Sequence, residues 1–90
     1  MTITEEAQAL AQELIESILT ITKVDYSAHK DVIAHDIEEY VFSGNWDHTV
    51  EIEGMKDIRI IQEDEYEQSM DEDEQPEDAF LTCGYYIDLW

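Results

Sequence analysis

Apolar residues in the first part of the chain recur at intervals of three or four residues. This spacing is typical of an amphipathic helix, which presents its apolar residues on one face and its polar residues on the other. The apolar face consists of Ile3, Ala7, Leu10, Ala11, Leu14, Ile15, Ile18 and Leu19. Thr2 and Glu5 have the spacing of a capping box, so we predict that the helix begins close to Thr2.

A second segment, from about residue 28 to 43, has the same helical spacing. Its apolar positions are Val32, Ile33, Ile37, Tyr40 and Val41. Ser27 is a candidate N-cap, and Gly44 is typical of the residue that follows the C-terminal end of a helix. Because the link between the two segments is short, we predict a helical hairpin.

From His48 onward the period changes to two, which is typical of a half-buried strand. The alternating apolar positions are Val50, Ile52, Ile58 and Ile60, and the polar residues between them are Glu51, Glu53 and Arg59. The intervening residues 54 to 57, Gly-Met-Lys-Asp, have the composition of a turn. This region therefore predicts a β-hairpin.

The last segment, from Ala79 to Trp90, alternates in the same way and predicts one more strand. One face would carry Ala79, Leu81, Cys83, Tyr85, Ile87 and Leu89, and the other face Phe80 and Trp90. The whole chain thus predicts an α+β fold of the order ααβββ, in which a two-helix hairpin packs on one face of a three-stranded antiparallel sheet. We expect a single domain that spans residues 1 to 90.

Between the second and third predicted strands lies a strongly acidic segment, residues 62 to 78. It contains ten carboxylates and no basic residue. Such a segment is either a long solvated loop or a short acidic helix that is ended by Pro76, and the sequence leaves both alternatives open.

The balance of charge is extreme, because 24 Asp and Glu residues stand against 4 Lys and Arg residues and give a net charge of −20. Solubility alone requires much less of a small domain. Direct binding to nucleic acid or to an anionic membrane needs clustered basic residues, which this chain lacks. The expected partner is therefore a basic protein. Apolar residues form 43% of the chain, enough for a folded core.

The single cysteine, Cys83, and the acidic N-terminal sequence favour a reducing compartment and no secretion signal. We expect a cytoplasmic protein without a membrane span, located in the host cytoplasm if a phage encodes it. The sequence does not distinguish a monomer from a homodimer.

Residue spacing gives little indication of metal binding or catalysis. Residues 71 to 78 lack the glycine that an EF-hand loop requires, and His29, His35, His48 and Cys83 lack the spacing of zinc ligands. No phosphate loop or nucleophile motif is recognisable. We expect no cofactor, no dedicated metal site and no enzymatic activity.

Acidic residues occur on the predicted helices and strands as well as in the acidic segment. Alternate strand positions lie about 6.6–6.8 Å apart and neighbouring positions on a helix face about 5–6 Å apart, which is the order of the charge repeat along a DNA duplex. Such a surface would imitate phosphates. We predict a partner-binding surface made of Glu51, Glu53, Glu63, Asp64, Glu65, Glu67, Asp71, Glu72, Asp73, Glu74, Glu77 and Asp78.

Two pieces of sequence extend this interpretation: NWDHTVEIE, residues 45 to 53, and CGYYIDLW, residues 83 to 90. They resemble the acidic strand that follows the second helix, and the closing strand, of small acidic bacterial proteins that mimic double-stranded DNA. In size and composition the chain is also similar to phage proteins that block restriction, recombination, uracil-repair or CRISPR enzymes. The resemblance implies two helices followed by an antiparallel sheet, and an inhibitor of a DNA-binding protein or nuclease with an anti-restriction or anti-CRISPR role.

Two alternatives remain at this point. An immunity or antitoxin-type inhibitor would cap the basic active site of one toxin through a few strong contacts, with Trp46 or Trp90 as a candidate aromatic contact. General adaptation to high salt would also produce an acidic surface and would imply no partner.

Overall fold

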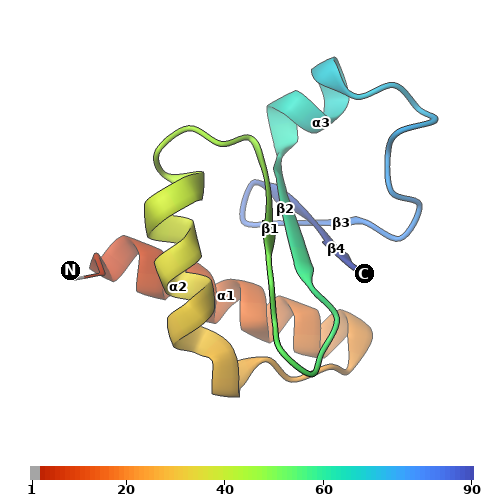
Figure 1. Cartoon of the computed structure of the whole chain (residues 1–90). Coiled ribbons are helices and arrows are strands. Elements are labelled where there is room, and N and C mark those ends of the chain that lie inside the picture. Colours follow the sequence, from red (N-terminus) through yellow and green to blue (C-terminus); the bar gives the residue numbers. More distant parts are fainter. Residues whose placement is uncertain (1–2) are drawn as a thin grey trace. The chain divides into compact units, whose positions relative to one another are not determined.

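The computed structural model describes residues 3 to 90 and has an α+β fold, as predicted. The chain divides into two compact units, Met1–Gly44 and Asn45–Trp90. The first unit contains the two N-terminal helices, and the second contains a four-stranded antiparallel sheet with a short helix between its second and third strands (Figure 1).

Helix α1 covers Glu5–Thr22 and confirms the first predicted helix. Its buried residues follow the predicted spacing and are Ala7, Ala11, Leu14, Ile15 and Ile18. Thr2, the predicted cap, lies outside the described residues. Thr4 is the N-cap, and its hydroxyl accepts a hydrogen bond from the Ala7 N–H at 3.3 Å. The helix ends at Lys23, whose positive φ of 66° lets its N–H reach the carbonyl of Leu19.

The second helical segment changes its winding twice. It begins as a 3₁₀ turn, η1 (Ser27–His29), continues as α2 (Lys30–Asp36) and ends as a π-helical turn, η2 (Ile37–Val41). Ser27 is not the N-cap that the sequence indicated. Its N–H instead donates to the carboxylate of Asp25 at 2.9 Å, and this bond lowers the pKa of Asp25. The segment otherwise has the predicted extent, and Gly44 follows it with a φ of 116°.

The sheet consists of β1 (Asp47–Val50), β2 (Ile58–Gln62), β3 (Phe80–Thr82) and β4 (Tyr85–Leu89) in the order β1-β2-β4-β3. The predicted hairpin is present as β1 and β2, with the apolar residues Val50, Ile52, Ile58 and Ile60 buried. Ile61 is buried as well, so β2 has buried apolar residues on both of its faces.

The prediction of one strand between Ala79 and Trp90 was wrong, because this segment forms a second hairpin. Cys83 and Gly84 have φ values of 55° and 83°, and positive φ at both central residues is what a two-residue type I′ turn requires. The turn pairs Leu81 with Tyr86 and Phe80 with Ile87. Leu81 and Phe80 therefore lie on the faces opposite to those that a continuous strand would have given them.

Helix α3 covers Glu63–Ser69, so the acidic segment contains a short helix, which ends at Ser69 and is not ended by Pro76. The segment starts as a short helix directly after β2, and a run of turns from residue 70 to 79 leads into β3. We call residues 63 to 79, which are α3 and these turns, the acidic excursion. Figure 1 shows the acidic excursion beside the end of the sheet at which β2 ends.

Candidate acidic interface

The register of the strands places one set of polar residues on a common face of the sheet. Residues that are paired across strands point to the same side, so the set is read directly from the pairing. We call this side the Arg59 face; it carries Asp47, Thr49, Arg59, Ile61, Leu81, Tyr86 and Asp88. The opposite face carries the buried apolar residues Val50, Ile58, Ile60 and Ile87.

Arg59, the only arginine of the chain, is fixed by Asp47. Its Nε donates to Oδ1 of Asp47 at 2.9 Å, and its Nη2 donates to Oδ2 at 2.6 Å. Both side chains are mostly covered, with 20% of Arg59 and 26% of Asp47 exposed. These bonds raise the pKa of Arg59. A bidentate pair of this kind is geometrically specific, and it cancels the charge of one carboxylate.

Asp88 lies directly opposite Arg59 on the neighbouring strand β4. Partial burial raises the pKa of Asp88, and the nearby charge of Asp78 raises it further, while Arg59 acts in the opposite direction. The carboxylate of Asp88 is therefore incompletely compensated by the arginine beside it.

Helix α3 is held on the sheet by two stacked tyrosines. The ring of Tyr66 on α3 lies 3.8 Å from the ring of Tyr86 on β4, at an angle of 17° between the planes. The Tyr66 hydroxyl donates to the Pro76 carbonyl at 3.3 Å, which connects the start and end of the excursion. Burial raises the pKa of Tyr86, with a further contribution from Glu67 and Glu63. The stack thus holds the acidic helix against the Arg59 face.

The turns after α3 are ordered by Gln75. Its side-chain amide donates to the carbonyls of Tyr66 and Met70, at 3.1 and 3.2 Å. Met70 is buried, and the N–H of Glu74 donates to the carbonyl of Asp71 at 2.9 Å. The carboxylates between residues 71 and 78 are consequently carried on a folded backbone.

The twelve residues of the predicted surface form two groups. Glu51 and Glu53 lie in the connection between β1 and β2, whereas the other ten lie on α3 and in the turns that follow it: Glu63, Asp64, Glu65, Glu67, Asp71, Glu72, Asp73, Glu74, Glu77 and Asp78. Each of the twelve is exposed or half-buried. The two groups are separated by the length of β2, which is about 14 Å at 3.4 Å per residue. The predicted residues therefore do not form one continuous patch.

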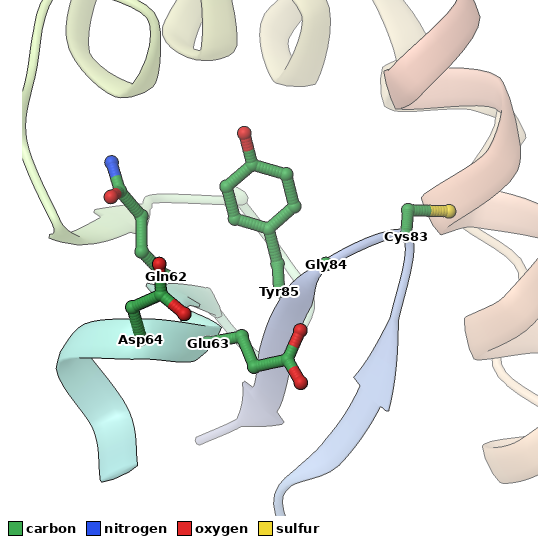
Figure 2. A pocket seen from close by; sticks show the side chains of 6 residues that line it. All are labelled: Gln62, Glu63, Asp64, Cys83, Gly84 and Tyr85. Atoms are coloured by element: carbon green, nitrogen blue, oxygen red, sulfur yellow. The ribbon is translucent and has the colours of Figure 1, made fainter. Parts of the chain in front are cut away.

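A surface hollow lies at the start of α3 and has a volume of about 330 Å³. Figure 2 shows its lining residues, which are Gln62, Glu63, Asp64, Cys83, Gly84 and Tyr85. The N–H of Glu63 donates to the carbonyl of Gly84 at 3.2 Å, so the first turn of α3 is tied to the β3–β4 turn. Two predicted carboxylates, those of Glu63 and Asp64, thus lie at a fixed position on the rim of the sheet.

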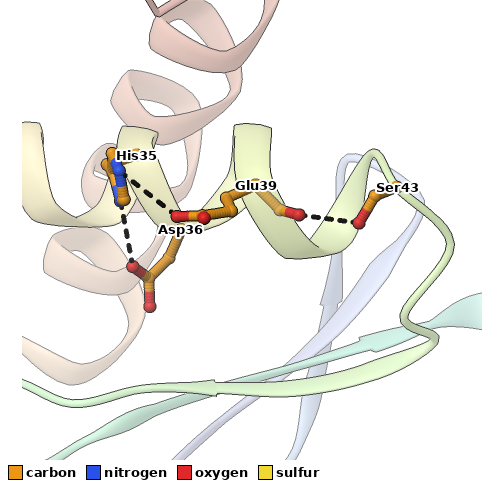
Figure 3. Close-up of polar contacts among 4 residues, drawn as sticks. All are labelled: His35, Asp36, Glu39 and Ser43. Atoms are coloured by element: carbon orange, nitrogen blue, oxygen red, sulfur yellow. Dashed lines mark hydrogen bonds and ion pairs between the residues drawn. The ribbon is translucent and has the colours of Figure 1, made fainter. Parts of the chain in front are cut away.

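The first unit contains acidic side chains that have partners within that unit. Figure 3 shows the ring of His35 in contact with both Asp36 and Glu39, with N–O distances of 3.6 and 3.3 Å. The Ser43 hydroxyl donates to the backbone carbonyl of Glu39 at 2.7 Å. The hydroxyl of Thr4 donates to Glu38 at 2.6 Å. These acids were not among the predicted binding residues.

Three residues of the Arg59 face and its surroundings were missed by the prediction of the site: Asp47, Asp88 and Tyr66. The pattern of β1 and β4 places Asp47 and Asp88 on strands, but only the register brings both beside Arg59.

Both tryptophans that were singled out are accessible, with 37% of Trp46 and 64% of Trp90 exposed.

Comparison of the chain with protein-family models, with curated proteins and with solved structures finds no match. Within residues 3 to 90, no three His, Cys, Asp or Glu side chains are arranged to hold a metal ion. None of the helices in the same part of the chain has the length and apolar character needed to cross a membrane.

Proposed function

We propose that the protein imitates DNA and inhibits a DNA-binding protein or nuclease by occupying its nucleic-acid-binding surface. The observation that carries this proposal is the ordered backbone of the acidic excursion. Ten carboxylates between residues 63 and 78 are carried on a backbone that is tied down by the tyrosine stack and by the two hydrogen bonds of Gln75. Carboxylates held in place bind basic side chains without the entropic cost of ordering a flexible loop.

The proposal is supported further by the way in which the basic residues are used. Arg59 is paired with Asp47, which leaves three lysines against the remaining acids. No charged side chain among residues 3 to 90 is buried, so the excess charge lies at the surface. Such a field steers a basic partner toward the protein, and association should be fast and sensitive to salt. A phage-encoded anti-restriction or anti-CRISPR inhibitor would require these properties.

The experiment is a capture of bacterial proteins on the immobilised chain, followed by competitive elution. Captured proteins should elute when a 20-base-pair DNA duplex is added. With the concentrations of both competitors expressed as negative charges, less duplex than polyglutamate should be needed. The affinity should fall at least about tenfold between 50 and 200 mM NaCl, because several ion pairs are lost together. Retention of the captured proteins in the presence of excess duplex would overturn the proposal.

Matched variants separate the two acidic groups. One variant carries Asp71→Asn, Glu72→Gln, Asp73→Asn and Glu74→Gln, and the other carries Glu51→Gln and Glu53→Gln. Mimicry of a duplex predicts graded losses in both variants, because many carboxylates share the contact.

An immunity or antitoxin-type inhibitor is the second candidate, and the exposed indole of Trp90 favours it. Few strong contacts around an aromatic residue are typical of such interfaces. Single alanine substitutions at Glu51, Glu53, Asp71 and Asp73 distinguish the two functions. One dominant loss of affinity would favour the toxin inhibitor, and four similar small losses would favour the mimic.

A further inference from the structure

Trp90 combines an exposed ring with a fixed backbone. The residue is 64% exposed, a larger fraction than Trp46 or Leu81. Its N–H donates to the carbonyl of Asp57 at 3.1 Å, and its carbonyl accepts from the Asp57 N–H at 2.8 Å. These two bonds extend the sheet by one residue pair. A partner that covers the ring would not have to order the backbone first.

The Arg59 face already binds one guanidinium group, that of Arg59 itself. The carboxylate of Asp47 accepts two hydrogen bonds from it, and its Cζ atom lies 5.7 Å from the centroid of the Trp90 ring. A planar guanidinium is suited to both contacts at once, because it donates in its plane and stacks on aromatic rings with its faces. The chain therefore contains an example of the recognition that this face can provide.

Asp88 supplies a second carboxylate close to the indole. It lies two positions before Trp90 in an extended segment, which places both residues on the Arg59 face about 6.8 Å apart. Asp88 is half-buried and lies opposite Arg59, and burial raises its pKa even though Arg59, the Leu89 N–H and Lys56 act in the opposite direction. A carboxylate that is already partly desolvated gains more from a new cation than a fully hydrated one does.

We infer that Trp90 and Asp88 bind one arginine side chain of a basic protein partner, with the indole stacked on the guanidinium and the carboxylate accepting its hydrogen bonds. This inference rests on the proposed function only in requiring a basic protein as the partner. The charge of −20 selects a cationic group, and the paired aromatic and carboxylate groups select arginine over lysine. The more distant carboxylates of the acidic excursion attract the basic partner but do not distinguish arginine from lysine.

The test compares fluorescently labelled tetra-arginine and tetra-lysine peptides, which carry equal charge, by anisotropy in 150 mM NaCl. The wild-type protein should bind tetra-arginine more tightly. Trp90→Leu keeps an apolar side chain but removes the aromatic face, and it should reduce the ratio of the two affinities about two- to fivefold. Trp46→Leu and Leu81→Ala, which alter other exposed apolar side chains, should leave the ratio unchanged.

Asp88→Asn tests whether the carboxylate of Asp88 contributes to the preference for arginine. Glu51→Gln is its control, because it removes one negative charge that lies outside the pair of Trp90 and Asp88. Glu51→Gln should weaken both peptides equally, whereas Asp88→Asn should weaken tetra-arginine more than tetra-lysine. An unchanged ratio in Trp90→Leu, or equal behaviour of Asp88→Asn and Glu51→Gln, would overturn the inference. Urea denaturation of each variant checks that the fold is retained.

The outcomes of this test and of the DNA competition are independent. If duplex DNA fails to displace captured proteins but Trp90→Leu removes the preference for arginine, mimicry is wrong and the arginine site stands. If DNA displaces them and the ratio does not change in Trp90→Leu, the arginine site is wrong and mimicry stands.

Discussion

Arg59 and Asp47 are joined across β1 and β2 by two hydrogen bonds of 2.9 and 2.6 Å, in a position where both side chains are largely covered. The pair lies on a diagonal of the antiparallel ladder, since Thr49 is the residue directly opposite Arg59. The only arginine of a very acidic chain is thus used inside the sheet to fix the register of its first hairpin.

Breaking this pair should destabilise the second unit. Asp47→Asn removes the charge that compensates Arg59, and we expect the free energy of unfolding to fall by about 1 kcal/mol. A double-mutant cycle with Arg59→Gln, measured by urea denaturation, should give a coupling of similar size. The same cycle between Arg59→Gln and Thr49→Ala is the control. Equal couplings in the two cycles would contradict the importance of the bidentate pair.

Removing the tyrosine stack should release the acidic excursion while the sheet remains folded. Tyr66→Ala eliminates the stacking on Tyr86 and the contact with Pro76, and we expect a loss of about 2 kcal/mol. Hydrogen exchange should accelerate between residues 63 and 75 much more than in β2. Tyr66→Phe keeps the stack and loses only the hydroxyl bond, so its effect should be about 1 kcal/mol or less. Unchanged exchange in Tyr66→Ala would refute the role of the stack.

Asp88 should make a small contribution to the pH dependence of stability. Its pKa is raised in the folded protein, mainly by burial, so its ionised form costs stability above the folded pKa. The cost disappears as the pH falls through the folded pKa toward the ordinary value near 3.9. Asp88→Asn should therefore be more stable than the wild type at pH 7, by about 0.5 kcal/mol, and the difference should shrink toward pH 4.

Urea denaturation at several pH values, with Glu51→Gln as the control for the loss of one charge, checks this expectation. A difference between Asp88→Asn and the wild type that grows as the pH falls would have the wrong sign for a raised pKa.

Salt should stabilise the fold through screening. A net charge of −20 on 90 residues produces self-repulsion, which extends over about 30 Å at 0.01 M salt but only about 8 Å at 0.15 M. The midpoint of thermal unfolding should rise between 0.01 and 0.2 M NaCl and level off at higher concentration. A requirement for molar salt would instead indicate adaptation to a saline environment, and an indifferent midpoint would show that the charges are too far apart to repel.

Periodic segments were predictable from the sequence because each depends on local geometry. The 3.6-residue period of α1 and the two-residue period around Val50 and Ile58 report which side of one element is apolar. The change of winding at Ile37 and the turn at Cys83 were not predictable in this way. The π turn at Ile37–Val41 and the positive φ of Cys83 are both uncommon conformations, so the periodicity of the sequence does not predict them.

The candidate site likewise has some features that the sequence predicts and others that only the structure shows. Composition alone predicts the sign of the partner's charge, since 24 acidic residues cannot all be compensated by 4 basic ones. The separation of Glu51 and Glu53 from the acidic excursion depends on where β2 begins and ends. The pairing of Asp47 with Arg59, and the approach of Trp90 to the same guanidinium, depend on a strand register that no single segment encodes.

The sequence by itself thus determined the α+β class, the helical and strand periods and the acidic character. The class and the periods depend on residues that are neighbours in the chain, and the acidic character depends only on the amino-acid composition. The tertiary structure decided which carboxylates are neutralised, which are held in place and which lie beside an aromatic ring. These are properties of residues distant in the chain, and hydrogen bonding between strands and the packing of Tyr66 on Tyr86 bring them together.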